Sequence, residues 1–272
     1  MPHDVTAARA SFRALHQSGC FVLPNPWDVG SARMLAHLGF SALASTSAGY
    51  AWTIGLPDNQ VTRDGVLEHL AQLCRATDLP VNADYESGFA EEPEGVAANV
   101  RLAIDTGVAG LSIEDRDGTP TGLYDIAFAT ERIRAARRAI DDSGQNVILV
   151  ARTEGLLVDP SALTPAIDKL VAFAQAGADC LYAPGVMAKA DIVAMVRAVA
   201  PKPVNVVISK PGTRVADFAE MGVRRISIGG ALARAAWAGA LDAARTLREG
   251  SFDGFAGATP SRELNGMFAP FA

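Results

Sequence analysis

Cysteine and histidine are both scarce in this chain of 272 residues. The three cysteines are Cys20, Cys74 and Cys180. Their odd number, their wide spacing and the lack of a C-x-x-C pair argue against a disulfide framework and a cysteine zinc site, so we expect reduced thiols. The four histidines lie in the leader or in predicted helices, at His3, His16, His37 and His69. A histidine-based catalytic triad or zinc centre is therefore disfavoured.

Basic clusters and long apolar runs are also missing. The chain has 24 basic and 30 acidic residues without a stripe of clustered lysine and arginine, so nucleic acid is not an expected partner. Residues 1–4 are polar and lead into an amphipathic segment, so we expect no signal peptide. No apolar run is long enough to span a bilayer. These absences favour a cytoplasmic protein without a membrane partner.

The sequence does contain a repeated alternation of strand-like and helix-like segments. Eight short apolar runs occur at residues 20–23, 41–44, 80–83, 110–113, 147–150, 180–182, 203–207 and 225–228. Each is followed by polar or glycine-bearing residues and then by a segment of helical periodicity, such as 94–105 or 161–176. Such alternation builds a parallel sheet and eight units close a barrel, so we predict one (β/α)₈ TIM barrel of the α/β class over residues 1–272.

Two segments lie outside this repeat. Helical spacing of Val5, Ala8, Phe12 and Leu15 predicts an N-terminal helix before the first strand. Residues 251–272 form a C-terminal extension that we predict to be helical. Its large apolar side chains are Phe252, Phe255, Met267, Phe268 and Phe271. A monomer rarely exposes so much aromatic surface, so we expect an intersubunit element, with a tail packed on its own barrel as the alternative.

Four carboxylates follow the second, third and fourth predicted strands, where a barrel carries its catalytic groups. They are Asp58, Asp84, Glu86 and Glu114. Converging on one side of the rim they would repel one another, and an oxygen-rich cluster of this kind suits a hard cation. We predict Mg²⁺, with Mn²⁺ as the alternative metal. Solvated or helix-capping acids are the other interpretation, which fits Asp28 and Asp125 better because each opens a predicted helix.

One cation and one hydroxyl-rich loop face these acids. Arg152 ends the fifth predicted strand, and its planar guanidinium is suited to binding a carboxylate, although an ion pair with Glu154 or Glu114 is the structural alternative. The Ser-Thr-Ser segment at residues 45–47 offers hydroxyls and backbone N–H groups for a substrate carboxylate, although a simple turn would look similar.

The remaining candidates are acid–base and substrate-binding groups. With no histidine at the rim, proton transfer falls to carboxylates, Tyr50, Tyr182 or water. We predict Tyr50, Asp58 and Arg152 as catalytic residues. The predicted substrate contacts are Ser45, Thr46, Ser47, Arg152 and Asn205. Lys210 alone among the lysines lies near this face, which makes a Schiff-base aldolase a poor second choice.

Six short motifs occur in order along the chain: NPWDVGSA at 25–32, LPD at 56–58, NADYESGF at 82–89, IED at 113–115, VARTE at 150–154 and ISIGG at 226–230. In this order, at these strand ends, they resemble the isocitrate lyase/phosphoenolpyruvate mutase family. The resemblance implies Mg²⁺ held chiefly by Asp84, with Asp58, Glu86 and Glu114 acting partly through water. It also implies that residues 45–47 and Arg152 hold a substrate carboxylate, and that the chain forms a homo-oligomer, a dimer or a tetramer, by exchanging C-terminal helices.

Two departures from the family's sequence pattern narrow the range of expected activities. Glu86 stands where the family usually has a second aspartate. The loop at residues 116–122 lacks the acid cysteine of isocitrate and methylisocitrate lyases and the asparagine of phosphonopyruvate enzymes. We predict a Mg²⁺-dependent enzyme, a lyase or decarboxylase, that cleaves a C–C bond of a small 2-oxo or 2-hydroxy dicarboxylate through a metal-stabilised enolate. The alternatives are a phosphonopyruvate mutase or hydrolase and a catalytically silent 2-oxo acid binding protein.

Overall fold

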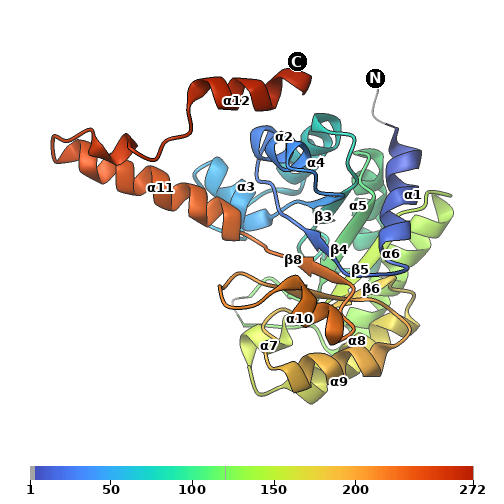
Figure 1. Cartoon of the computed structure of the whole chain (residues 1–272). Helices are drawn as coiled ribbons and strands as arrows, with labels where there is room; N and C mark the ends of the chain where they lie inside the picture. Colours follow the sequence, from blue (N-terminus) through green and yellow to red (C-terminus); the bar gives the residue numbers. More distant parts are fainter. Residues whose placement is uncertain (1–3, 120, 272) are drawn as a thin grey trace.

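A computed structural model describes residues 4–119 and 121–271 and shows a parallel barrel surrounded by helices (Figure 1). Its strands are β1 (Phe21–Leu23), β2 (Leu43–Ala44), β3 (Val81–Asp84), β4 (Gly110–Glu114), β5 (Ile148–Arg152), β6 (Cys180–Tyr182), β7 (Val204–Val207) and β8 (Arg225–Ser227). All eight overlap the predicted apolar runs. The predicted (β/α)₈ barrel is therefore confirmed.

The strands pair in the order β1-β8-β7-β6-β5-β4-β3-β2, and every pair is parallel. The sheet closes between β1 and β2 through two isolated hydrogen bonds and not through a continuous β-ladder. The Ala44 N–H donates to the Pro24 carbonyl at 3.0 Å, and the Asn25 side-chain amide donates to the Ser45 carbonyl at 2.8 Å. The barrel is thus nearly closed, and the ends of its strands surround one cavity.

The α-helices are α1 (Val5–Leu15), α2 (Val29–His37), α3 (Ser47–Thr53), α4 (Arg63–Ala76), α5 (Pro93–Asp105), α6 (Ile126–Asp142), α7 (Gly155–Val158), α8 (Leu163–Gln175), α9 (Lys189–Val199), α10 (Val215–Glu220), α11 (Ala231–Arg248) and α12 (Ser261–Phe268). In α5, proline stands in the first turn and Val96, Val100 and Ile104 are buried, as their spacing predicts. Within the described residues, no helix is long and apolar enough to cross a membrane.

Helix α1 covers the N-terminal end of the barrel. The Arg9 guanidinium donates to the carbonyls of Val108 and Ile104, just before β4, and the Phe12 side chain is fully buried. Gly110 makes this packing possible, because a Cβ there would lie 2.7 Å from both the Phe12 ring and the Asn82 amide oxygen. The N-terminal end of the barrel is therefore closed by packed side chains. The predicted N-terminal helix is confirmed.

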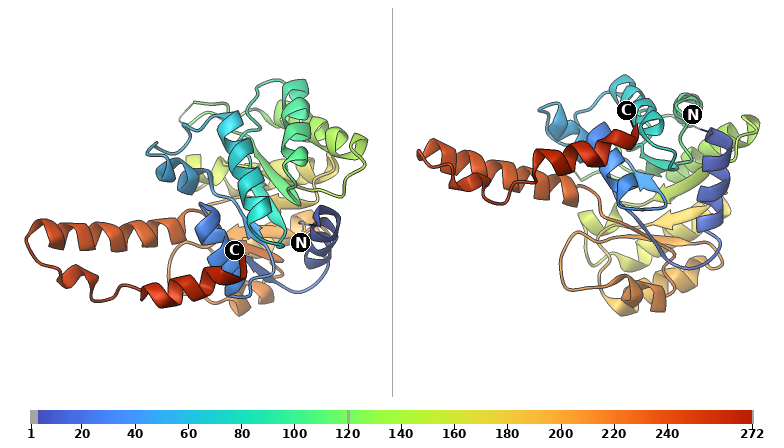
Figure 2. Two further views of the ribbon diagram at one scale, coloured as in Figure 1. Left: turned by 90° about the horizontal axis from the view of Figure 1, so that it is seen from above. Right: turned by 45° about the horizontal axis from the view of Figure 1, so that its top comes forward.

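The C-terminal extension leaves the barrel. Helix α11 projects from the end of β8, and the chain turns through a 3₁₀ turn, η1 (Asp253–Phe255), before α12 returns beside α2 (Figures 1 and 2). The Arg33 guanidinium of α2 lies 5.4 Å from the centre of the Phe271 ring in the last turn, η2 (Ala269–Phe271). The extension is helical, as predicted; its exchange between subunits stays a prediction.

Candidate active site

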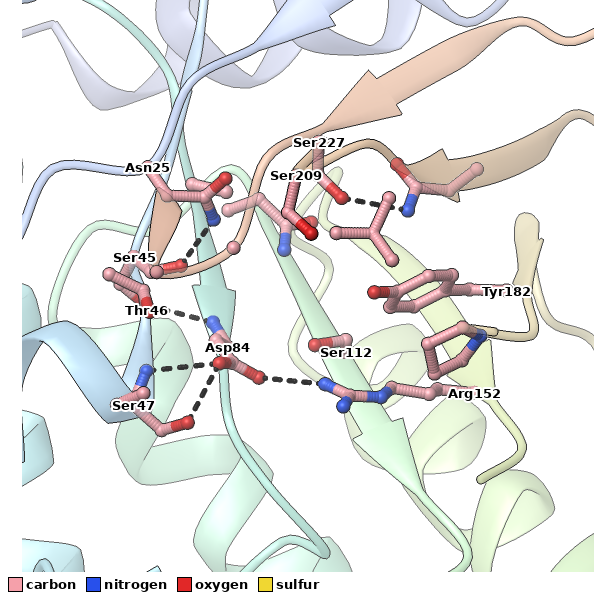
Figure 3. Close-up of a pocket in the computed structure, with 18 of the residues that line it drawn as sticks. Asn25, Ser45, Thr46, Ser47, Asp84, Ser112, Arg152, Tyr182, Ser209 and Ser227 are labelled. Carbon is pink, nitrogen blue, oxygen red and sulfur yellow. Dashed lines mark hydrogen bonds and ion pairs between the residues drawn. The ribbon is translucent and has the colours of Figure 1, made fainter. Parts of the chain in front are cut away.

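A cavity of about 430 Å³ opens at the C-terminal ends of the strands. The predicted residues that line it are Ser45, Thr46, Ser47, Asp58, Asp84, Arg152 and Asn205. Figure 3 shows Asp84 and Arg152 pointing toward each other across this space, with Ser47 on the Asp84 side and Tyr182 beside Arg152. The strand ends thus bring together residues that are up to 160 positions apart, from Ser45 to Asn205.

Asp84, the last residue of β3, is held in a fixed orientation by the loop after β2. Its Oδ2 accepts hydrogen bonds from the Ser47 N–H and the Ser47 hydroxyl, both at 3.0 Å, and its own N–H donates to the Ser45 hydroxyl at 2.8 Å. Its Oδ1 lies 3.4 Å from a terminal nitrogen of Arg152. Two of the three predicted carboxylate-binding hydroxyls therefore already bind Asp84 in this structure.

Thr46 has a structural task in the same loop. It is the N-cap of α3, and its hydroxyl accepts the Gly49 N–H at 3.2 Å. Glycine is needed at position 49 because a Cβ there would lie 2.6 Å from the Thr46 methyl group and 2.9 Å from the Trp27 Cβ. The start of α3 consequently lies tight against the strand ends, which fixes Ser47 against Asp84.

Arg152 ends β5 among three carboxylates. Its Nε lies 2.5 Å from Glu154, and one terminal nitrogen lies 3.3 Å from Glu114 and 3.4 Å from Asp84. Burial opposes its charge, but Glu114, Tyr182, Glu154 and Asp84 together raise the pKa of Arg152 well above its usual value. The structural ion pairs considered at the sequence level are therefore present, and the guanidinium remains at the cavity wall.

Asp115 holds the β5 end in place, a role that the sequence did not reveal. This carboxylate is almost fully buried and accepts the Thr153 hydroxyl and the Glu154 N–H, both at 2.8 Å. Lys169 of α8 lies 2.6 Å from it and also donates to the Tyr124 carbonyl. A buried, fully bonded ion pair of this kind fixes the backbone that carries Arg152.

Glu86 and Glu114 lie behind the cavity wall rather than among its lining residues. Burial, followed by repulsion from Asp84 and Glu114, raises the pKa of Glu86 to about 8. Its Oε1 is buried and has no hydrogen-bond partner among the described residues. Burial likewise raises the pKa of Glu114 to about 7, against the attraction of Arg152. Asp58 lines the cavity, and burial raises its pKa above the usual value as well.

These observations test whether the residues fit a divalent cation. In residues 4–119 and 121–271, no three acidic, histidine or cysteine side chains stand close enough to form a ready-made cage. Mg²⁺ does not require one, because it usually keeps several waters and binds through one or two carboxylates. A nearby positive charge would favour the ionised form of the carboxyl groups whose pKa values are raised. It would also give the buried Glu86 Oε1 an electrostatic partner. The donor set therefore fits a divalent cation such as Mg²⁺, which Asp84 would hold at the cavity wall.

Tyr50 is not brought into the cavity. Helix α3 turns it outward, and its ring stacks on His69 of α4 at 4.2 Å between centroids. Trp52 instead lines a separate apolar groove with Trp237. Tyr50 lies one turn after Ser47 on α3, yet its ring packs on α4 instead of lining the cavity, so the contact with His69 decides its position. The position of Tyr50 does not support a catalytic role, whereas Tyr182 does line the cavity.

The floor of the cavity contains a cation that the sequence interpretation missed. Arg225, the first residue of β8, lines the cavity together with Asn82, Ser112 and Ser227. Both faces of a barrel strand are usually buried and apolar, so a charged residue inside the run at 225–228 was the available signal.

Fold and site together define the class: a TIM-barrel protein with acidic and basic side chains converging at the C-terminal strand ends, where barrel enzymes carry their active sites. The family model for phosphoenolpyruvate phosphomutase matches residues 12–248. The chain therefore belongs to this family and is an enzyme of the isocitrate lyase/phosphoenolpyruvate mutase superfamily.

Relatives agree with this assignment. An uncharacterized protein of Mycobacterium tuberculosis is 33% identical over 88% of this chain and 90% of its own length. The 2-methylisocitrate lyase of Escherichia coli is 30% identical over 57% and 54%, and an oxaloacetate decarboxylase of Rhodopseudomonas palustris is 28% identical over 81% and 77%.

Solved structures agree as well. A protein from Burkholderia cenocepacia J2315 is 46% identical, covers 98% of both chains and superposes with a TM-score of 0.94. Oxaloacetate acetylhydrolase, solved with its product oxalate, is 27% identical over 98% of this chain and 96% of its own, with a TM-score of 0.88.

Proposed function

We propose that the protein is a Mg²⁺-dependent carbon–carbon lyase or decarboxylase that acts on a small 2-oxo or 2-hydroxy dicarboxylate. The observation that carries this proposal is the Asp84–Arg152 pair at the cavity wall, beside the two further carboxylates of Glu114 and Glu154. Two guanidinium groups face this cluster, because Arg116 lies 3.6 Å from Glu154, and they do not neutralise Asp58, Asp84, Glu114 and Glu154 together. A bound divalent cation would balance this charge and supply Lewis-acid polarisation of the substrate's 2-oxo group.

The chain's own residues bind and orient the substrate. Ser45 and Ser47 hold Asp84 in place for the metal. Arg152 presents its planar guanidinium to the cavity, where this group can bind a carboxylate of the substrate. Tyr182, whose pKa burial raises to about 12, stays protonated and can donate a hydrogen bond at the cavity wall. In a partly closed site such donors are preorganised for negative charge that develops as a bond breaks.

The names of relatives support small 2-oxo and 2-hydroxy acids as substrates. They include an oxaloacetate decarboxylase, an oxaloacetate acetylhydrolase and a 2-methylisocitrate lyase. Oxaloacetate is the strongest candidate because the loop at 116–122 carries neither cysteine nor histidine. A general acid typically contributes about 10²–10⁴ in rate, so methylisocitrate should be cleaved poorly at best.

A substrate panel tests the proposal. Purified protein with Mg²⁺ is assayed for turnover of oxaloacetate, methylisocitrate, 2,3-dimethylmalate and phosphonopyruvate. Release of pyruvate or oxalate from oxaloacetate is the expected result, and it should disappear with EDTA. Turnover of phosphonopyruvate alone would assign the mutase or hydrolase alternative. Binding of 2-oxo acids without any turnover would instead indicate the silent binding protein.

We also propose that a second copy of the chain covers the apolar face of α11. Of residues 231–248, all of them described, only Ala233 is buried, and Trp237 and Leu241 are exposed beside the groove formed with Trp52 and Leu56. Exposed apolar patches of this kind mark protein interfaces.

Light scattering with size exclusion tests this assembly. Trp237→Glu should shift an oligomer to monomer, whereas Leu102→Glu, which changes an equally exposed apolar residue of α5, should not. A wild-type monomer at micromolar concentration would contradict the proposal.

A further inference from the structure

Arg225 is buried inside the barrel beneath the active site. Only 3% of its surface is exposed, yet it borders the cavity. Its Nε donates to the Asn205 amide oxygen at 2.9 Å, and one terminal nitrogen donates to the Asn82 amide oxygen at 3.2 Å. The same nitrogen lies 3.4 Å from His16 Nε2. Barrel interiors are normally filled with branched apolar side chains, so this polar floor departs from the usual packing.

The charge of Arg225 has no anionic partner. Among the residues that the structure describes, no carboxylate lies within 4.0 Å of its guanidinium. The neighbouring titratable groups are neutral, because burial raises the pKa of Cys180 to about 11 and that of Tyr182 to about 12. Burial, with a further contribution from Arg225, lowers the pKa of His16 to about 3. A buried cation held by amide oxygens, a neutral imidazole and the Phe12 ring, 6.0 Å from its guanidinium carbon, is costly, so the position calls for an explanation.

The distance between the floor and the wall of the cavity suits a short molecule. Asn82 and Asp84 both point into the barrel, and two residues along a strand span about 6.6 Å. This distance is comparable to the length of a four-carbon dicarboxylate. One end of such a molecule can lie at Asp84 and Arg152 while the other end approaches the Asn82 and Arg225 side chains.

We propose that Arg225 is a specificity-determining residue that recognises the second carboxylate of a dianionic substrate at the floor of the cavity. The inference rests on the proposed function for the identity of the substrate, but its chemistry requires only a small dicarboxylate. A carboxylate near Arg225 supplies the missing counter-charge, and Asn82 and Asn205 hold the guanidinium in position for it. Burial lowers the pKa of Arg225, which agrees with a charge that is not balanced by the protein alone.

Matched acids that differ by one carboxylate test this role. Calorimetric titrations compare succinate with butyrate and malate with 2-hydroxybutyrate, with and without Mg²⁺. The variants are Arg225→Gln, which keeps a hydrogen-bonding side chain without the charge, and Arg224→Gln as the control. Arg224 is the preceding residue, lies outside the barrel interior and donates to the Gly19 carbonyl at the surface.

The expected result is a change in selectivity rather than a general loss of binding. Wild type should bind each dianion at least about tenfold more tightly than its monoanion, and Arg225→Gln should lose most of that preference. Binding of the monoanions should change by less than about threefold. Arg224→Gln should behave as wild type. An unchanged dianion preference in Arg225→Gln, or no preference in wild type, overturns the inference.

Two further measurements keep the inference testable if Arg225→Gln does not fold. Arg225→Lys retains the charge and should retain part of the preference. A crystal structure of wild type with malate should show a carboxylate oxygen within hydrogen-bonding distance of Arg225; a second carboxylate directed toward the cavity mouth overturns the inference.

The substrate panel and the Arg225 titrations can fail independently of each other. Lack of turnover with an Arg225-dependent preference for dianions contradicts only the proposed function. Turnover with unchanged selectivity in Arg225→Gln contradicts only the role of Arg225.

Discussion

Arg152 and Arg225 are both buried beside the same cavity, but their electrostatic surroundings are opposite. Arg152 at the wall lies within 3.4 Å of three carboxylates. Arg225 at the floor contacts amide oxygens and a neutral histidine. Arg116 also lies 3.6 Å from Glu154, so two cations face Asp58, Asp84, Glu114 and Glu154, and the wall keeps an excess of carboxylates. Among the described residues, the floor has a positive charge without an anion. A divalent cation complements the first, and an organic dianion complements the second.

The difference shows how one cavity can bind a metal and an acid together. Opposite charges in a low-dielectric site attract strongly and would neutralise one another, so separating the excess acids from Arg225 keeps each available for its own ligand. The polar contacts that hold the two regions are also distinct. Ser47 holds Asp84, Asp115 holds the end of β5, and Asn82 and Asn205 hold Arg225.

The largest effect is expected at Asp84. Asp84→Asn preserves the shape but removes the charge proposed to bind the metal, so turnover should fall by roughly 10³-fold, since a catalytic metal contributes several kcal/mol. Titration calorimetry should show weaker binding of Mg²⁺ and of the 2-oxo acid together. Asp64→Asn, at an exposed carboxylate, is the control. If Asp84→Asn binds the acid as well as wild type, with and without Mg²⁺, the shared site is wrong.

A stability difference between the two arginines is expected next. Arg152→Met removes the cation shared by Asp84, Glu114 and Glu154, with Arg116 still beside Glu154, and should lower the free energy of unfolding by about 3–5 kcal/mol. Arg225→Met leaves only amide oxygens unpaired and should have a smaller effect, about 1–3 kcal/mol.

Urea denaturation of metal-free protein measures both variants. Arg224→Met, at the surface, should stay within about 0.5 kcal/mol of wild type. Equal losses for Arg152→Met and Arg225→Met would show that the two buried charges are balanced alike, contrary to the comparison.

A smaller effect is expected for Arg152→Lys. Lysine retains the positive charge near Glu114 and Asp84 but cannot reproduce the planar fork, so affinity for a 2-oxo acid should fall by about tenfold. Affinity for Mg²⁺ should change little, because the charge beside the metal site is preserved. The two affinities are measured in one calorimetric series. Equal weakening of metal and acid would contradict separate roles for Arg152 and Asp84.

The pH dependence of stability should have opposite signs for the two regions. The raised pKa of Glu86, about 8 against 4.5, makes metal-free protein less stable as pH rises from 4.5 to 8, because the unfolded chain ionises first. The lowered pKa of His16, about 3 against 6.5, makes the protein less stable as pH falls from 6.5 toward 3, because the unfolded chain binds the proton first.

Thermal unfolding across this range separates the two groups. Glu86→Gln should flatten the decline on the alkaline side, and His16→Gln should flatten the decline on the acid side. A Glu86→Gln profile identical to that of wild type would show that this carboxyl is not held protonated.

Part of the site could be read from the sequence because strand ends are predictable. The apolar runs place Asp84, Glu114 and Arg152 at the C-terminal ends of three neighbouring strands, and parallel pairing brings such ends together. Asp58 was also placed correctly at the cavity, although it lies in a loop. Tyr50 does not line the cavity, because its ring stacks on His69 of α4, a tertiary contact that the sequence does not reveal.

The sequence by itself determined the eightfold alternation, the two terminal helical segments and the set of polar residues that follow the strands. These features depend on local periodicity and on the type of residue at each strand end. Only the tertiary structure decided which carboxylates share Arg152, that Asp115 holds the β5 end, and that Arg225 reaches the cavity floor with no carboxylate of the described residues beside it. Such properties depend on distances between strands far apart in the chain and on burial, which determines how strongly each charge is felt.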